Sequence, residues 1–110
     1  MDIDTVVKNG ITFIKLDGVF DSKAFKKFND EIDYLLYNQG ISLYAISFNV
    51  SRIDDNLIAK IQNKLVEIFL SCGEVVMCGL NKIYQKKIGN RKNKLYYVDN
   101  IASAFQLLNI

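Results

Sequence analysis

The stretch Phe13-Ile-Lys-Leu-Asp-Gly-Val-Phe-Asp21, continued by Ser22-Lys-Ala-Phe-Lys-Lys-Phe28, decides the fold. Its first half is an apolar strand that reaches a glycine, and its second half begins a helix. Gly18 can adopt the positive φ that a turn out of a sheet requires. Asp21 can accept hydrogen bonds from the free N–H groups of the first helical turn, and its charge suits the positive end of the helix dipole. The stretch therefore predicts a strand, a turn and a helix in direct succession.

The remainder of the chain alternates in the same way. Asn9-Gly10 predicts a type I′ hairpin between two strands at residues 3–7 and 11–17, because both turn positions need positive φ. The nearly continuous apolar run Leu43-Tyr-Ala-Ile-Ser-Phe48 predicts a central strand covered on both faces. Further strands are expected at residues 74–78 and 95–98. Helices are expected at residues 22–38, 55–71 and 82–89 and after Asp99. The predicted order is ββαβαβαβα, in one α/β domain over residues 1–110.

Periodicity predicts which helical side chains face the core. The first helix should close at Gly40 and the second at Gly73, while Asn81 and Asp99 should cap the last two. Residues at spacings of three and four form the inward stripes: Phe25, Phe28, Ile32, Leu35 and Leu36, then Leu57 or Ile58, Ile61, Leu65, Ile68 and Phe69, then Ile101, Ala104, Phe105 and Leu108.

Composition limits the chemistry. The chain has no His, so it lacks a His-based triad, a His general base and a His metal ligand. Cys72 and Cys78 are six positions apart, which fits neither a zinc knuckle nor a redox pair, and they are expected to be reduced, semi-buried core residues. We therefore expect no enzymatic activity, no metal and no cofactor. The chain has no apolar run of about 18 residues and no signal peptide at Met1, so a cytoplasmic protein is predicted.

Four short motifs occur in order along the chain: Leu16-x-Gly18-x-Phe20-Asp21, Ile53-Asp54, Val76-Met-Cys-Gly-Leu80 and Leu95-Tyr-Tyr-Val-Asp-Asn-Ile-Ala-Ser-Ala-Phe105. In this succession the chain resembles the STAS domains, and among them the bacterial anti-sigma-factor antagonists. The resemblance implies a mixed sheet of four or five strands with helices packed mainly on one face. It also implies a regulatory protein that binds other proteins.

The same resemblance places function at the junction after the third strand. The antagonists carry Ile-Asp-Ser-Ser-Gly-Leu there, and an anti-sigma-factor kinase phosphorylates a serine at the start of the helix. This chain instead reads Ser51-Arg-Ile-Asp-Asp-Asn-Leu-Ile58. Asp55 and Asn56 stand where the serines would be, and Leu57 stands in place of the glycine. The usual phosphoacceptor is therefore missing.

Three interpretations of this departure are open. Asp54 or Asp55 simply caps the second helix. Alternatively, Asp55 provides a permanent negative charge, although a carboxylate has less charge and fewer oxygens than a phosphate. In the third interpretation, Ser51 is the phosphosite. The expected partner-binding residues are Ser51, Arg52, Asp54, Asp55, Asn56, Leu57 and Ile58.

Two kinds of protein partner follow from the resemblance. One is a kinase of the anti-sigma-factor type, and the other is a lipid-transport ATPase complex, in which STAS-like accessory subunits need no phosphoserine. A basic cluster occupies the third helix and the loop after it: Lys82, Lys86, Lys87, Arg91, Lys92 and Lys94. A solvated loop is favoured over an anion site, and a net charge of +2 does not predict a nucleic-acid partner.

Overall fold

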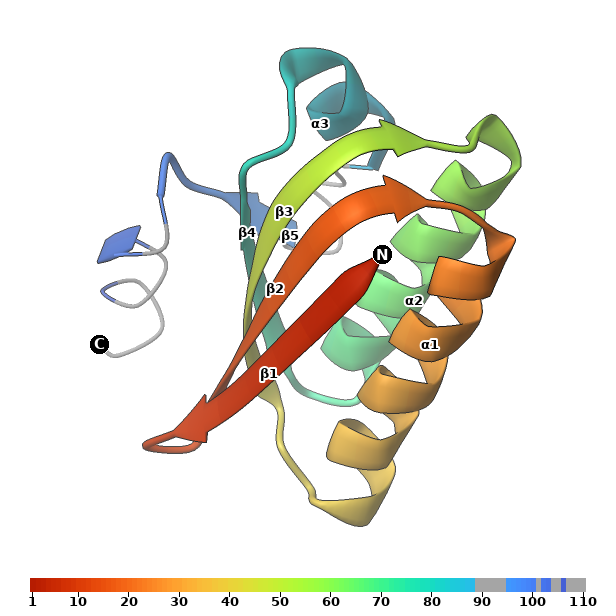
Figure 1. Ribbon diagram of the computed structural model, residues 1–110. Coiled ribbons are helices and arrows are strands. Elements are labelled where there is room, and N and C mark those ends of the chain that lie inside the picture. The colour runs from red at the N-terminus through yellow and green to blue at the C-terminus, as the bar shows by residue number, and fades with distance from the viewer. Residues whose placement is uncertain (89–94, 101, 104–105, 107–110) are drawn as a thin grey trace.

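The computed structural model describes residues 1–88, 95–100, 102–103 and 106, and its centre is a five-stranded mixed sheet (Figure 1). Strand β1 runs antiparallel to β2, and β2 to β5 are parallel in the spatial order β1-β2-β3-β4-β5. This confirms the predicted mixed sheet. The strands are β1 (Asp2–Lys8), β2 (Ile11–Phe20), β3 (Leu43–Ile53), β4 (Glu74–Cys78) and β5 (Leu95–Tyr97).

Helices α1 and α2 pack side by side on one face of the sheet (Figure 1). α1 (Ser22–Asp33) continues into a π-helical turn (Tyr34–Asn38), and α2 (Ile58–Leu70) follows a 3₁₀ turn (Asp55–Leu57). The short helix α3 (Lys82–Ile88) connects β4 to β5. Most of the predicted last helix lies outside the described residues. Its cap is Asn100 instead of Asp99, because Asn100 Oδ1 accepts a 2.9 Å hydrogen bond from the Ser103 N–H.

The local turn and cap signals are largely confirmed. Asn9 and Gly10 have φ values of 55° and 77°, and Lys8 pairs directly with Ile11 across the hairpin. Asp21 caps α1 through a 2.9 Å hydrogen bond from the Ala24 N–H to its Oδ1. This hydrogen bond lowers the pKa of the Asp21 carboxyl.

Gly18 differs from its prediction. Its φ of 119° is positive as expected, but β2 does not end there and continues to Phe20. The pairing register with β3 shifts there: Gly18 pairs with Val50 and Val19 pairs with Arg52, which leaves Ser51 of β3 as the extra residue of a β-bulge. A bulge bends the strand without ending it, which carries the pairing of β2 and β3 beyond the rest of the sheet.

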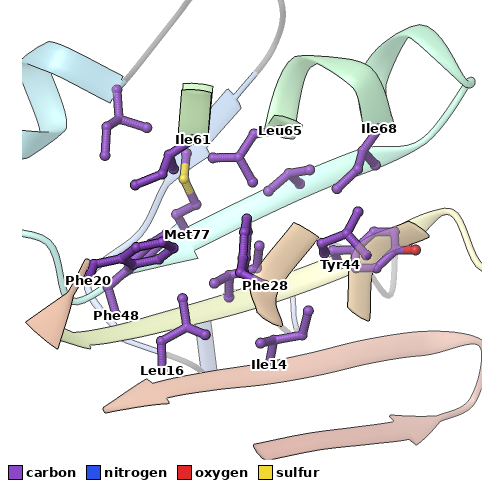
Figure 2. Close-up of a cluster of buried hydrophobic side chains, with 14 of the residues drawn as sticks. Ile14, Leu16, Phe20, Phe28, Tyr44, Phe48, Ile61, Leu65, Ile68 and Met77 are labelled. Atoms are coloured by element: carbon purple, nitrogen blue, oxygen red, sulfur yellow. The ribbon is translucent and has the colours of Figure 1, made fainter. Parts of the chain in front are cut away.

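The main core lies between the sheet and the two long helices (Figure 2). β3 is the central strand, and Tyr44, Ile46 and Phe48 are buried on the helical side, which confirms the prediction for residues 43–48. Phe20 and Phe28 meet edge to face with ring centroids 5.5 Å apart. Full burial of a side chain of this size contributes about 2–3 kcal/mol.

The predicted inward-facing residues of α1 and α2 have the correct spacing, but the residues at the edges of these stripes are less buried than predicted. Ala24 is buried in α1 while Phe25 is half-buried, and Phe69 of α2 is also half-buried. The unexpected member is Lys64, whose residue is only 7% exposed between α1 and α2. Its ammonium donates to Asp33 and, over 3.1 Å, to Glu67. Burial disfavours the charge, but these two acceptors outweigh it and raise the Lys64 pKa.

The end of α2 also corrects a prediction. Cys72, with φ of 65°, occupies the left-handed position that was expected of Gly73. The Cys72 N–H donates to the Phe69 carbonyl over 3.0 Å and the Gly73 N–H to the Ile68 carbonyl over 2.9 Å, which is a Schellman motif. Cys72 is exposed, so of the two cysteines only Cys78 is a core residue as predicted.

Candidate protein-interaction site

The paired ends of β2 and β3 position the predicted site. Their parallel register extends to Phe20 opposite Ile53, and the Asp54 N–H donates to the Phe20 carbonyl over 3.1 Å. Both strands therefore deliver their following helices, α1 and α2, from the same edge of the sheet (Figure 1). Since β3 runs to Ile53, Ser51 lies within the strand.

The predicted site residues divide into exposed and buried groups. Ser51, Arg52, Asp55 and Asn56 are exposed, and Asp54 and Ile58 are half-buried. Leu57 is 1% exposed and belongs to the core, so it cannot be among the surface residues that contact a partner. This removes one predicted residue from the site. Its burial also anchors the turn that displays Asp55 and Asn56.

Neither aspartate caps the helix through its side chain, contrary to one interpretation of the sequence. Among the described residues, no side chain caps the 3₁₀ turn or the start of α2. Asp54 occupies the N-cap position of the turn, but it accepts the Leu57 N–H through its backbone carbonyl, over 2.9 Å. Its carboxylate instead pairs with Arg52 Nε at 3.3 Å. Such an exposed pair contributes less than about 1 kcal/mol.

The first turn of the second helix thus keeps backbone N–H groups that no described side chain caps, beside the exposed Asp55 and Asn56. Free N–H groups at a helix start favour an anion or a hydrogen-bond acceptor. The turn is consequently suited to polar recognition of another molecule.

Helix α3 contributes residues that the sequence did not assign to this edge. Asn81 caps α3 as predicted, with the Tyr84 N–H donating to its Oδ1 over 2.9 Å. The Tyr84 hydroxyl in turn accepts the Ile53 N–H over 3.3 Å, which ties α3 to the end of β3. Ile83, next to this tyrosine, is 64% exposed. An apolar residue in a short, lysine-rich helix was the only available signal for this extension.

Part of the basic cluster lies among the described residues. Lys82, Lys86 and Lys87 are exposed on α3, while Arg91, Lys92 and Lys94 lie outside the described residues.

In the described part of the chain, no three His, Cys, Asp or Glu side chains gather as a metal site would require. Within the same part, no helix combines the length and apolar character needed to cross a membrane.

Solved structures resemble this chain over nearly its full length. The anti-sigma-factor antagonist SpoIIAA in its unphosphorylated form has a TM-score of 0.80 and 14% identity, and the match covers 98% of both chains. The chain has the fold of the anti-sigma-factor antagonists. A Thermotoga maritima protein described as a putative anti-sigma-factor antagonist gives a TM-score of 0.80 at 15% identity, covering 98% of this chain and 95% of that one.

The Bacillus cell fate determinant SpoIIAA in its phosphorylated form shares the STAS-like fold with a TM-score of 0.74 at 12% identity, covering 96% of this chain and 99% of that one. No family model and no curated protein matches the sequence. The STAS-like architecture predicted from four short motifs is therefore confirmed at the level of fold.

Proposed function

We propose that this chain is a non-enzymatic, cytoplasmic protein-interaction module that binds its partner through the end of β3 and the first turn of the second helix. The observation that carries the proposal is the exposed pair Asp55 and Asn56 on a turn with uncapped N–H groups, in a chain with the antagonist fold. The proposed contact residues are Ser51, Arg52, Asp54, Asp55, Asn56 and Ile58.

In this proposal the partner interaction is not switched by phosphorylation of the helix start. Asp55 and Asn56 offer no hydroxyl, and Asp55 places a constant charge on the turn. Ser51 has a hydroxyl, but it lies within β3, where its Oγ is 3.5 Å from the Gly18 carbonyl. A kinase that recognises a helix start would meet no acceptor at residues 55 and 56.

The missing hydroxyl also supports a second candidate, an accessory subunit of a lipid-transport ATPase complex. Such a subunit binds constitutively and needs no phosphoserine. The two candidates share the surface but differ in the partner. A pull-down from native lysate, followed by mass spectrometry, distinguishes an anti-sigma-factor kinase from transporter ATPase and permease subunits.

The decisive test is incubation with an anti-sigma-factor kinase and ATP, followed by mass spectrometry of the intact and digested protein. The wild type is expected to stay unmodified. Asn56→Ser should gain one phosphate, slowly because of the adjacent Asp55 charge, since it restores a hydroxyl at a helix start. Asn63→Ser is the matched control, because Asn63 is exposed in the middle of α2, where the backbone N–H groups are used by the helix.

Partner binding is then measured with Asn56→Arg and its control Asn63→Arg. We expect the first to weaken binding at least about tenfold and the second to leave it unchanged, as for a residue inside and a residue outside an interface. A phosphate mapped to Ser51 of the wild type would contradict the proposal that binding is independent of phosphorylation. Equal affinity of both arginine variants would remove this surface from the function.

A further inference from the structure

The outer edge of β1 has the features of a self-complementary interface. In the sheet, β1 pairs with β2 on one side and is the terminal strand on the other. Its sequence Asp2-Ile-Asp-Thr-Val-Val-Lys8 carries acidic residues at one end and a lysine at the other. Val6 and Val7 are 60% and 50% exposed, which is unusual for adjacent valines on a strand. A terminal strand with unpaired backbone groups and exposed valines favours pairing with another strand.

The distribution of charge indicates which strand fits. When two copies of β1 run antiparallel about a two-fold axis through Thr5, Asp2 of each copy lies opposite Lys8 of the other. This register pairs all seven residues of the strand. Moving the axis by one residue toward the N-terminus would place the two Asp4 side chains opposite each other. Moving it to Val6 would leave Asp2 and Ile3 without strand residues opposite them.

The existing hairpin supports the same register. Asp2 is the cross-strand partner of Asp17 within the chain, which places two carboxylates opposite each other. Like charges in this position destabilise a sheet. Lys8 of a second copy, on the other side of Asp2, would place a cation next to this pair on the same face. Self-pairing would therefore place the positive charge of Lys8 beside two carboxylates that repel each other within the hairpin.

Helix α1 brings further charged residues to the region beside β1. A groove of about 560 Å³ separates β1 from α1, and its lining includes Lys27, Asp30 and Glu31. The two-fold axis stands perpendicular to the joined sheet, so α1 of both copies lies on the same side and runs antiparallel. The charged residues Lys27, Asp30 and Glu31 of both copies then line grooves on the same side of the joined sheet.

From these observations we propose that two copies of this chain associate through antiparallel pairing of their β1 strands, centred on Thr5, so that the two five-stranded sheets become continuous. In this register Val7 of each copy lies opposite Ile3 of the other, Val6 lies opposite Asp4, and the charges of Asp2 and Lys8 are paired twice. This inference does not rest on the proposed function, because residues 51–58 lie at the end of β3 and not on the β1 edge.

Sedimentation equilibrium over a roughly hundredfold range of concentration tests the proposal. The wild type should show a concentration-dependent dimer. Lys8→Glu should weaken it at least about tenfold, since two attractive cross-strand pairs become repulsive. Asp2→Lys combined with Lys8→Glu should restore the dimer to within about threefold of the wild type. Lys60→Glu, an exposed lysine on α2, is the charge-matched control and should have no effect.

Two further variants report the register. Asp4→Lys combined with Lys8→Glu should fail to restore the dimer. In a Cys72→Ser background, Thr5→Cys should form an intermolecular disulfide on mild oxidation, because residues on the axis face each other about 5 Å apart, while Asp2→Cys should not. A wild type that stays monomeric, a Lys8→Glu variant that still dimerises, or rescue only by the Asp4→Lys combination would each overturn the proposal.

Discussion

Thr12 illustrates at the scale of one residue how the core tolerates a polar group. The residue is fully buried on β2, and its hydroxyl has no hydrogen-bond partner among the described residues. An unpaired buried hydroxyl destabilises the folded state relative to an apolar group of the same shape. Valine has that shape, because a methyl group replaces the hydroxyl.

We predict that Thr12→Val raises the free energy of unfolding by about 1 kcal/mol, as measured by urea denaturation. Ser47→Ala is the control, because Ser47 is only half-buried on β3 and the loss of its hydroxyl should change the free energy of unfolding little. A loss of stability in Thr12→Val would contradict the prediction and would show that the hydroxyl has a partner, such as a buried water molecule.

The carboxylate of Asp21 caps the start of α1. Its lowered pKa means that the charged form is favoured in the folded protein. The stabilisation that it contributes is therefore complete above the unfolded-state pKa and is lost as the pH falls through the lower, folded-state value. That window lies below about pH 4.

Asp21→Ala should be less stable than the wild type at neutral pH, because the Ala24 N–H loses its acceptor. The difference should shrink as the pH falls below about 4. Asp21→Asn keeps a capping oxygen without a titrating group, so its stability should lack this component of pH dependence. Unfolding curves for the three proteins at several pH values check this. A constant difference between Asp21→Ala and the wild type over the acidic range would contradict it.

At the scale of the elements, the distance between a glycine and a neighbouring strand decides whether a residue with a side chain can replace it. Gly79 follows β4 with φ of 90°, and a Cβ there would lie 2.3 Å from the Phe48 carbonyl oxygen of β3. Gly40, after the π-helical turn, has φ of 67°, but a Cβ there would meet no atom within 4 Å. The two glycines share a left-handed backbone and differ in the space around them.

Gly40→Ala is expected to cost about 1 kcal/mol, the usual penalty of a left-handed alanine. Gly79→Ala should cost at least about 2 kcal/mol more, because the end of β4 must also move away from β3. Urea denaturation of both variants measures the difference. Similar losses in the two proteins would show that the strand end moves easily.

For the whole molecule, the positions of the potential metal ligands argue against a metal centre. The chain has no histidine, and its two cysteines separate, with Cys72 exposed after α2 and Cys78 buried at the end of β4. A structural zinc site needs four ligands that converge. We predict that the purified protein binds less than 0.1 equivalent of zinc, which elemental analysis measures after dialysis with and without chelator. One zinc per chain would contradict this.

The sequence by itself determined the features that depend on neighbouring residues. The Asn9-Gly10 turn, the Asp21 and Asn81 caps and the order of the elements from β1 to β5 follow from local backbone preferences and from the period of the apolar residues. The central position of residues 43–48 was also predictable from their nearly continuous apolar run. The expected cover on both faces is only partly present, because Leu43 and Ser47, on the face away from α1 and α2, are half-buried.

Only the tertiary structure decided which residues of the candidate site are accessible. Leu57 is buried, Ser51 lies inside an extended β3, and Tyr84 brings α3 to the end of that strand. Likewise, the left-handed position at the end of α2, which the sequence predicted for Gly73, is occupied by Cys72. These outcomes depend on how far β2 and β3 remain paired and on what packs against them. Such contacts join residues distant in sequence, so no local pattern encodes them.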